Sequence, residues 1–559
     1  HELDYGRKLY LIENCLYGVD IQSIAVQIAK MRFFISLIVD QRVDSSAPNL
    51  GVRPLPNLET KFVAANTLIG IEKPKQMLLR NPQIDAKEAE LRRVREKHFT
   101  ARTLSSKAKC REQDKKLLSE IAELLKSDDW GDKTAKQLSQ WDPYDQNASA
   151  PFFDPEWMFG VREGFDVVIG NPPYVRIQTL NQTDKSHATW IRNHYTSAAK
   201  GNYDLYVVFV ERGLQLLESE GQLAYILPHK FFNAQYGKPL RELVAWGKHL
   251  RYVVHFGDQQ IFPGATNYVC LLFLAKAGTN TCRWVSADDL PVWLQTLRGT
   301  EDLLPAQTVT AAEWNFVVGK GSSLFERLKA MPVKLEDVAE RMFQGSITSA
   351  DTVFLFKEFK PPKAGLVEVH SKEIDESVAL EWKLLKRVVR SGDIGRWKAE
   401  ATALVLFPYE VKNNEARLYT PAEMQKLFPR AWDYLKRSKR RLEGREQGSF
   451  KDSQWYRFGR SQNLGLWEQP KLMVPYMITE LGAYLDLSDN FYFINVTTGG
   501  YGITALPERI SLHYLCALLN SPVVVFFLLR VSSTFQVGYL ASKIQFIEKI
   551  PIPRLNLSD

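Results

Sequence analysis

The chain has 559 residues, of which 45% are hydrophobic and 24% are charged, and its formal net charge is +8. This composition excludes a chain that is disordered throughout, and the length predicts two or three domains. The positive charge favours polyanionic partners but does not establish one.

The cysteines and the hydropathy pattern exclude further classes. The five cysteines are scattered, without a C-x-x-C pair or nearby histidines, so we expect reduced thiols and no metal site. No apolar run is long enough to cross a membrane, and no signal peptide is visible. Because the first residue is His1, we expect the natural polypeptide to begin earlier.

The chain opens with an alternation of strand and helix. Residues 16–20 are predicted to form a short strand that ends at Asp20, and residues 21–39 are predicted to form a helix, because apolar side chains recur at helical spacing. A second strand is predicted at residues 61–65, just before Asn66 and Thr67. Strand, acid and helix in this order are typical of a doubly wound, Rossmann-like α/β fold.

An insertion interrupts this pattern at about residues 83–128. It is rich in Lys, Arg and Glu and carries pairs of leucines, which predicts two long exposed helices. The core pattern resumes at residues 165–170, whose continuous apolar run predicts a buried parallel strand. A helix, a strand, a helix and two closing strands are predicted next, at residues 205–217, 222–227, 239–246, 251–256 and 268–274.

A domain boundary is predicted near residues 315–335, which gives a first domain of residues 1–325 and a second of residues 330–559. The second domain has short strand-like segments, several tryptophans and a basic cluster at residues 436–441. This irregular pattern predicts a mixed α+β fold.

The tetrapeptide Asn171-Pro172-Pro173-Tyr174 directly follows the strand at residues 165–170. Ligands of α/β sheets bind at this end of a parallel strand. The Asn171 side-chain oxygen and the Pro172 carbonyl can accept hydrogen bonds from an exocyclic amine such as that of adenine. They would draw the lone pair of this nitrogen out of the ring, while the prolines fix the backbone. Tyr174 offers a flat face to an extruded base. A proline turn closed by a polar residue is the simpler alternative.

Residues 166–174 resemble the catalytic motif of the amino-group DNA methyltransferases, in the adenine-specific (gamma-class) branch. Further segments resemble other motifs of the same methyltransferases, at residues 17–21, 201–206, 221–228 and 256–265. Three segments near the end resemble the C-terminal recognition region of type IIG restriction–modification enzymes, at residues 498–502, 519–521 and 550–553. The resemblance implies an enzyme that methylates adenine in double-stranded DNA with S-adenosyl-L-methionine as cofactor. It also implies a bacterial or archaeal cytoplasmic protein, with a methyltransferase domain at residues 1–325 and a target recognition domain at residues 330–559.

The resemblance also assigns roles at the cofactor and base sites. Asp20 and Ile21 would bind the cofactor ribose, and Asn66 and Thr67 would lie near its adenine, where the family often has an aspartate. Phe262 would stack on the flipped target base together with Tyr174. The alternatives are that Asp20 only caps the following helix and that Phe262 is an ordinary core residue.

One expected motif is absent from the sequence. We find no glycine-rich cofactor loop in a strand-then-helix setting, so we expect that loop, and any nuclease domain, upstream on the same polypeptide or on a partner subunit. We therefore expect this chain alone to bind the cofactor weakly. A specificity fragment of a bifunctional restriction enzyme, or a subunit of another phage-defence system, stays open as an alternative. The recognised base sequence and the oligomeric state cannot be predicted from these residues.

Overall fold

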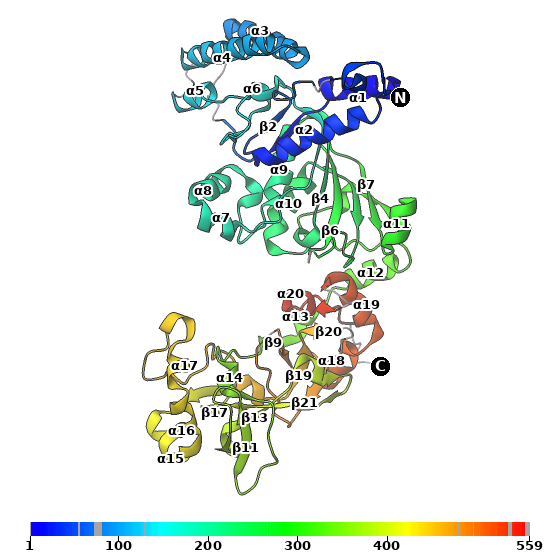
Figure 1. Ribbon diagram of the computed structural model, residues 1–559. Helices are drawn as coiled ribbons and strands as arrows, with labels where there is room; N and C mark the ends of the chain where they lie inside the picture. The colour runs from blue at the N-terminus through cyan, green and yellow to red at the C-terminus, as the bar shows by residue number, and fades with distance from the viewer. Residues whose placement is uncertain are drawn as a thin grey trace. The chain divides into compact units, whose positions relative to one another are not determined.

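The computed structural model describes residues 2–53, 56–71, 81–127, 130, 132–264, 267–478, 481–495, 497–534 and 539–553. Packing divides the chain into two compact units (Figure 1). The first unit comprises residues 1–255, 269–285 and 303–314, and the second comprises residues 256–268, 286–302 and 315–559. The two predicted functional domains, residues 1–325 and 330–559, stay a prediction.

The first unit alternates helices with strands, as the sequence predicts. Its elements are α1 (Glu2–Asn14), β1 (Gly18–Asp20), α2 (Ser23–Ile38), β2 (Phe62–Ala64), α3 (Pro82–Thr100), α4 (Leu104–Ser127), α5 (Asp132–Ser139), α6 (Pro155–Phe159), β3 (Phe165–Gly170), α7 (Ile177–Thr183), α8 (Lys185–His194), α9 (Tyr206–Leu216), β4 (Leu217–Pro228), α10 (Lys238–Trp246), β5 (Leu250–His255), β6 (Val269–Ala275) and β7 (Thr281–Ser286).

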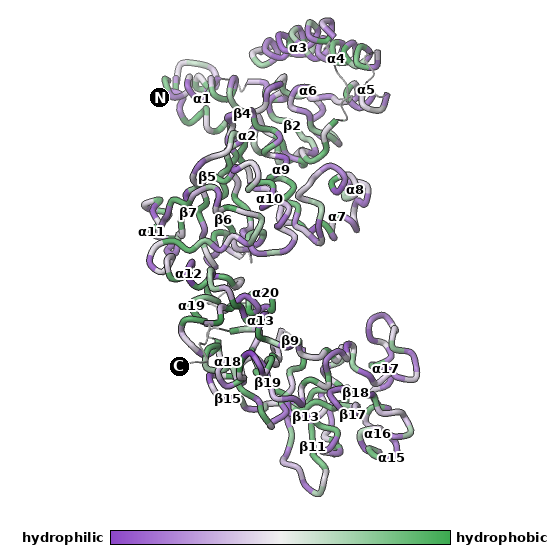
Figure 2. The backbone as a smooth tube through the Cα atoms, turned by 180° about the vertical axis from the view of Figure 1, so that it is seen from behind, coloured by the Kyte–Doolittle hydropathy of each residue, from purple (hydrophilic) through white to green (hydrophobic). Residues whose placement is uncertain are grey.

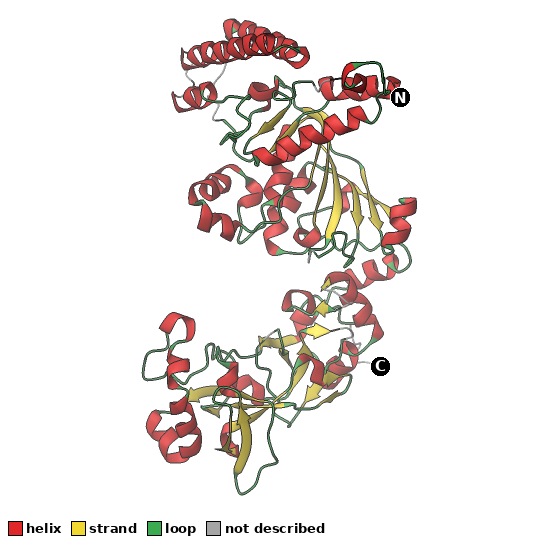
Figure 3. Cartoon of the chain, viewed as in Figure 1, coloured by secondary structure: helices red, strands yellow, loops and turns green. Residues whose placement is uncertain are grey.

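The main sheet has the strand order β3-β4-β6-β5-β7-β8, with β8 at Thr300–Pro305 (Figure 3). β3 and β4 are parallel, with Gly170 opposite Tyr225, whereas β6 is antiparallel to both β4 and β5. β1 and β2 form a separate parallel pair, with Asp20 opposite Ala64. Parallel strands followed by helices confirm the predicted α/β fold class.

The predicted insertion is confirmed as the helix pair α3 and α4, which lie side by side (Figure 1). Hydrophilic and hydrophobic residues alternate along both helices (Figure 2). One face of the pair is buried, through Ile84 and Leu91 on α3 and Leu117 and Ile121 on α4, so the helices are exposed on one side only. Apolar residues at intervals of three, four and seven produce that buried stripe.

One prediction about burial is wrong. β3 is not covered on both faces, because Val167 is 60% exposed and Ile169 is 76% exposed. On α2 apolar side chains also face outward, with Ile24 62% exposed and Ile28 54% exposed. In the described residues the face of β3 that carries Val167 and Ile169 stays largely uncovered, whereas Val168 on the other face packs against the core.

The second unit is a mixed α+β structure, as predicted. Its longer elements are α11 (Leu290–Thr296), α12 (Ser322–Lys329), β9 (Ala339–Gln344), β11 (Leu366–Ser371), β12 (Glu376–Glu381), β13 (Leu385–Val388), β16 (Ala403–Leu406), β17 (Tyr409–Lys412), β18 (Glu415–Leu418), α15 (Pro421–Leu427), α16 (Pro429–Arg437), α17 (Lys439–Glu443), β19 (Lys471–Pro475), β21 (Tyr484–Asp486), β22 (Gly500–Ala505), α18 (Leu512–Leu519) and α19 (Pro522–Val531). Shorter helices and strands complete it: α13 (Leu335–Val338), α14 (Asp351–Phe354), β10 (Leu355–Phe356), β14 (Ile394–Gly395), β15 (Lys398–Ala399), β20 (Met477–Ile478), β23 (Ser533–Thr534), β24 (Leu540–Ala541) and α20 (Ile544–Ile547).

Two hydrophobic clusters form the core of the second unit. One contains Phe354, Trp467 and Tyr492, and the other surrounds the sheet β21-β19-β22-β9 and includes Phe527 of α19. Within the described residues no single helix has the length and apolar character of a membrane span, although the bent pair α18–α19 meets both criteria jointly. Val524, Phe527 and Leu528 of α19 are buried, so this apolar segment is part of the core.

Candidate active site

The tetrapeptide Asn171-Pro172-Pro173-Tyr174 begins where β3 ends. The β3–β4 pairing continues to Gly170, opposite Tyr225, so the strand fixes the backbone up to the residue before Asn171. Gly170 has no side chain, and a Cβ there would lie 3.2 Å from the Tyr225 ring, so this packing favours glycine. The side chain of Asn171 is exposed and makes no hydrogen bond to any described residue, whereas Pro172 is buried. Asn171 is therefore free to bind a ligand while its neighbour is fixed.

Tyr174, the last residue of this loop, is half-buried. Its hydroxyl donates a hydrogen bond of 3.3 Å to the carbonyl of Ile226, on the neighbouring strand β4. Its ring stands almost perpendicular to that of Tyr206, at 87° with a centroid distance of 6.4 Å. Burial raises the pKa of the Tyr174 hydroxyl to about 12, so the phenol stays neutral at physiological pH.

The residues after Tyr174 are bound to the segment before α9. The Leu205 amide donates to the Val175 carbonyl at 2.8 Å, and the Ile177 amide donates to the Tyr203 carbonyl at 2.9 Å. Between these two bonds, Arg176 and Asp204 form an antiparallel β-bridge. The loop is thus held on both sides, by β3 before it and by this bridge after it.

The predicted cofactor residues lie at the ends of the parallel strands β1 and β2. The register places Asp20 opposite Ala64, so Asp20 and Ile21 end one strand at the sheet edge where Asn66 and Thr67 follow the other. Asp20 is exposed, and its Oδ1 accepts the Gln22 amide at 2.8 Å. This bond closes a local turn before α2, whose N-cap residue is Gln22, and the second carboxylate oxygen of Asp20 has no hydrogen bond among the described residues. Ile21 is 59% exposed.

Asn66 is less free than Asp20. Its side-chain oxygen accepts the Leu68 amide at 3.2 Å, and its backbone amide donates to Ala150. These two hydrogen-bond acceptors fit a ribose and an adenine. A carboxylate oxygen at one strand end can accept from hydroxyl groups, and an amide oxygen after the next strand can accept from an amine. Asp20 and Asn66 would hold these two groups.

The sequence interpretation missed two charged residues of α9 that organise this region. Arg212 donates to the Thr67 carbonyl at 2.9 Å and to the Phe153 carbonyl at 3.1 Å, which fixes the turn after β2. Glu211 is 5% exposed and accepts hydrogen bonds from Thr196 and Ser197. Two adjacent charges inside an apolar helix were the available signal, because buried charges need partners.

A single hydrophobic cluster joins the two predicted sites. It includes Val63 and Leu216, and Val19 of β1 and Val168 of β3 pack against it. The strand ends for the cofactor and for the amine therefore share one core within the first unit.

Phe262 belongs to the second compact unit, whereas the other predicted site residues belong to the first. It is 36% exposed, in the segment between β5 and β6, and Ala265 of the same segment falls outside the described residues. The expectation that it stacks on a base stays a prediction.

Two cavities, of about 190 and 440 Å³, occur in the first unit. The smaller lies between α2, β2 and the segment around Trp141, and the larger between α1, α3 and α6. Neither is lined by Asn171 or Asp20. Asp20 and Asn171 are both exposed at the ends of their strands.

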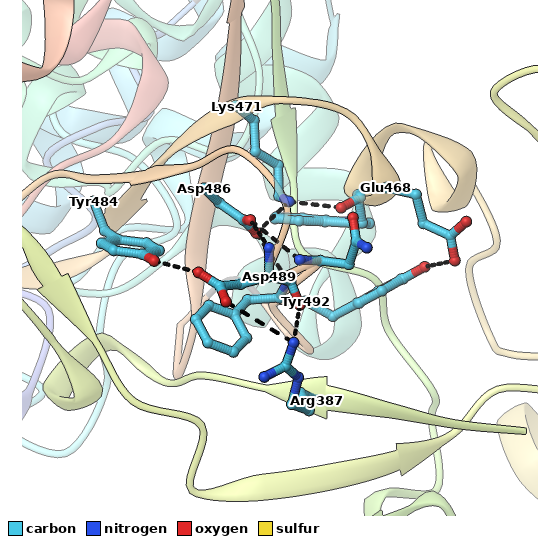
Figure 4. A network of polar contacts seen from close by, with 10 residues as sticks. Arg387, Glu468, Lys471, Tyr484, Asp486, Asp489 and Tyr492 are labelled. Atoms are coloured by element: carbon cyan, nitrogen blue, oxygen red, sulfur yellow. Dashed lines mark hydrogen bonds and ion pairs between the residues drawn. The ribbon is translucent and has the colours of Figure 1, made fainter. Parts of the chain in front are cut away.

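In the second unit a buried ion pair orders one loop (Figure 4). Lys471 Nζ lies 2.7 Å from Asp486 Oδ2, and both side chains are at most 1% exposed. Asp486 also accepts the amides of Asp489 and Phe491, and Lys471 donates to the Trp467 carbonyl. Burial lowers the pKa of Lys471 while Asp486 opposes that shift.

Arg387 on β13 is fixed by the same loop. Its Nη2 donates to the Asp489 carbonyl at 2.6 Å, and its guanidinium lies 5.0 Å from the centre of the Phe491 ring (Figure 4). Asp489 and Phe491 both follow Asp486, which accepts their amides, so the buried pair fixes the loop that contacts Arg387, an arginine that is itself 45% exposed.

Arg445 follows the predicted basic cluster at residues 436–441 but differs from it in burial. It is 3% exposed and donates to the carbonyls of Leu442, Thr348 and Trp455, so it is a structural residue. Arg440 and Arg441 of the cluster are exposed.

The first unit therefore presents an acid at the end of one parallel strand, β1, and Asn-Pro-Pro-Tyr at the end of another, β3, in two separate sheets. Residues 14–262 match the family described as Eco57I restriction-modification methylase, and residues 426–552 match the family described as TaqI-like C-terminal specificity domain. The chain is homologous to the type II restriction–modification methyltransferases.

The sequence relatives agree with these two families. The type II restriction enzyme and methyltransferase RM.Eco57I of Escherichia coli is 27% identical over 412 residues, which cover 71% of this chain and 41% of the relative. The type II methyltransferase M.PaeR7I of Pseudomonas aeruginosa is 26% identical over 413 residues, covering 70% and 65%. The chain thus spans less than two thirds of either relative.

A solved structure of the type IIL restriction-modification enzyme MmeI in complex with DNA aligns with 97% of this chain and 63% of its own, at 11% identity and a TM-score of 0.49. The type IIG restriction endonuclease BpuSI aligns with 86% of this chain at a TM-score of 0.29. Because both scores are below 0.5, the homology rests on the sequence matches.

Proposed function

We propose that this chain transfers a methyl group from S-adenosylmethionine to the exocyclic amine of an adenine in a specific double-stranded DNA site. The observation that carries this proposal is the position of Asn171, unbonded and exposed at the carboxyl end of β3, in a loop that is fixed before and after it. The names of the sequence relatives support methylation within restriction–modification systems.

The chemistry needs two acceptors for one amine. The Asn171 oxygen and the Pro172 carbonyl would each accept a hydrogen bond from one N–H group of the adenine amine. The lone pair of this nitrogen would then leave conjugation with the ring. Tyr174 would stack on the extruded base, with Phe262 as a second stacking residue. S-adenosylmethionine would supply the electrophilic methyl group, held through Asp20, Ile21, Asn66 and Thr67.

The DNA target would be chosen by residues 330–559, which include the match to a C-terminal specificity domain. A second candidate is a specificity fragment or subunit that is not catalytic by itself. The absence of a glycine-rich cofactor loop from the sequence favours this candidate.

The first prediction tests the proposed reaction. We expect Asn171→Ala to lower the rate of methyl transfer at least ~100-fold and to leave DNA affinity nearly unchanged, because the lost acceptor acts on the transition state. The measurement is transfer of labelled methyl to duplex DNA, with the product nucleoside identified by mass spectrometry. Asn181→Ala, an exposed asparagine on α7, is the control. Normal turnover of Asn171→Ala, or methylcytosine as the product, would contradict the proposal.

A further inference from the structure

Behind Tyr174, two tyrosines and an aspartate form a hydrogen-bonded chain. The Tyr206 and Tyr236 hydroxyls are 2.8 Å apart, and the Tyr236 hydroxyl donates to Asp204 Oδ2 at 3.0 Å. Tyr206 begins α9, Asp204 lies two residues before it, and Tyr236 precedes α10. The motif Gly201 to Tyr206 had no assigned role in the sequence interpretation.

The direction of this chain follows from the chemistry of its members. The Asp204 oxygen accepts the hydrogen bond from the Tyr236 hydroxyl, so Tyr236 donates its single hydroxyl hydrogen to it. The Tyr236 oxygen is then free to accept only, and the hydrogen between the two tyrosines belongs to Tyr206. Burial is the main reason that the pKa of the Tyr206 hydroxyl lies well above its usual value, so it remains a donor.

Both ends of the chain contact the catalytic loop. At one end the Tyr206 ring packs perpendicular to the Tyr174 ring. At the other end Asp204 is bridged to Arg176, two residues after Tyr174, between the backbone bonds of Val175 and Ile177. The Tyr206 side chain is fully buried, so it cannot shift without leaving its hydroxyl unsatisfied.

We propose that Tyr236, through Tyr206 and Asp204, is a positioning residue that fixes the angle and depth of the Tyr174 ring on which the target base stacks. This inference rests on the proposed function and adds to it a residue that contacts neither base nor cofactor. The same contacts fix the backbone that follows Asn171. A base stacked on a loosened Tyr174 would present its amine to Asn171 in a poorer geometry.

Three single substitutions form a graded test in the full protein. Tyr236→Phe removes both hydrogen bonds, because the Tyr236 hydroxyl donates to Asp204 and accepts from Tyr206. Tyr206→Phe removes only the hydrogen bond between Tyr206 and Tyr236. Tyr203→Phe is the matched control, because Tyr203 is also fully buried on the same segment and its hydroxyl has no partner among the described residues. The readouts are kcat, the KM for DNA, the melting temperature and the fluorescence of 2-aminopurine at the target adenine.

We expect Tyr236→Phe to lower kcat between about 10-fold and about 100-fold with the KM for DNA within about twofold, since misplacement affects the reaction more than docking. Tyr206→Phe should have a smaller effect and Tyr203→Phe almost none. The 2-aminopurine of a flipped base should be brighter in Tyr236→Phe than in the wild type, because a poorly placed ring quenches it less. This signal does not depend on turnover.

Two results would overturn the inference. One is a Tyr236→Phe variant with the kcat and fluorescence of Tyr203→Phe. The other is a lower kcat with unchanged 2-aminopurine fluorescence, which would mean that the chain acts on stability or elsewhere in the loop. If Tyr236→Phe melts below the assay temperature, kcat and fluorescence of Tyr206→Phe are compared with those of Tyr203→Phe. Equal values for these two variants would then overturn the inference. A wild-type protein that neither methylates DNA nor changes the fluorescence would instead refute the proposed function.

Discussion

At the scale of single residues, two substitutions of Tyr174 can distinguish the role of its ring from that of its hydroxyl. The hydroxyl makes one long hydrogen bond to a backbone carbonyl, so Tyr174→Phe should keep methyl transfer within a few-fold of the wild type. Tyr174→Ala removes the stacking face, which costs about 1–3 kcal/mol per base. Comparing kcat and 2-aminopurine fluorescence for the two variants tests this. Equal losses in both would show that the hydroxyl, not the ring, is essential.

The same residue leads to an expectation about pH. Its pKa is raised to about 12 by burial, so ionisation would begin far above the pH range of a normal assay. From pH 6 to pH 9 the ratio of wild-type to Tyr174→Phe activity should therefore stay constant. A ratio that changes in this window would mean that Tyr174 is not buried as described.

Part of the site could be predicted at this scale, and part could not. Asn171, Pro172, Pro173 and Tyr174 are contiguous, and a local motif after an apolar strand is visible without a structure. Tyr236 was invisible because its partners Tyr206 and Asp204 lie on a distant segment, and only the fold brings the three hydroxyl and carboxyl groups together. Burial of Arg445 was missed because its neighbours in sequence are exposed basic residues.

Among the elements, α8 carries a basic surface and follows the loop of residues 171–174 after one intervening helix, α7. Lys185 and Arg192 are exposed two helical turns apart, and the ion pair at the start of this helix joins His187 to Asp184 instead. In α4, by contrast, Lys126 is paired with Glu123. Lys185 and Arg192 have no ion-pair partner among the described residues, so under the proposed function they would meet DNA phosphates.

We expect Lys185→Gln with Arg192→Gln to weaken binding of all duplex sequences alike, because phosphate contacts carry no sequence information. The slope of log affinity against log salt should fall by about 2, roughly one per lost contact. Titrations of labelled DNA at several salt concentrations measure it, with Lys126→Gln as the paired-charge control. An unchanged slope would place the DNA backbone elsewhere.

The buried ion pair of β19 and β21 gives a prediction about stability. Asp486→Asn would leave the Lys471 charge buried without a counter-ion, and we expect a loss of about 3–5 kcal/mol in the free energy of unfolding. Lys471→Met combined with Asp486→Leu should cost less than either single change. Urea denaturation of the full chain measures the free energy of unfolding. Asp433→Asn, which breaks the exposed ion pair with Lys436, is the control. A double variant worse than Asp486→Asn would contradict it.

Element positions were largely predictable, and their surroundings were not. The helices and strands around residues 165–275 occur within a few residues of their predicted bounds, because apolar periodicity depends on local sequence. Whether a face of β3 is covered depends on which elements pack against that face, and periodicity carries no information about that. For this reason Val167 was expected to be buried and is not.

At the scale of the whole molecule, the division of labour between the two predicted domains can be tested by exchange. Replacing residues 330–559 with the matching region of a relative that modifies another site should transfer the donor's methylated sequence. Sequencing of modified bases after expression measures this. Exchange of residues 83–128, the α3–α4 insertion, is the control and should leave the modified site unchanged. Retention of the original site after the first exchange would refute the domain assignment.

The one-sided pairing of β3 also sets the rates at which its amide hydrogens exchange with solvent deuterium. β4 and β6 are paired along both edges, whereas β3 is bonded only to β4 in the described residues, so its outward amides should exchange first. The strand that presents Asn171 should therefore be labelled faster than its neighbours β4 and β6. Any molecule that completes this edge would slow the deuterium uptake of residues 165–170, and mass spectrometry of a single peptide would report it without any turnover.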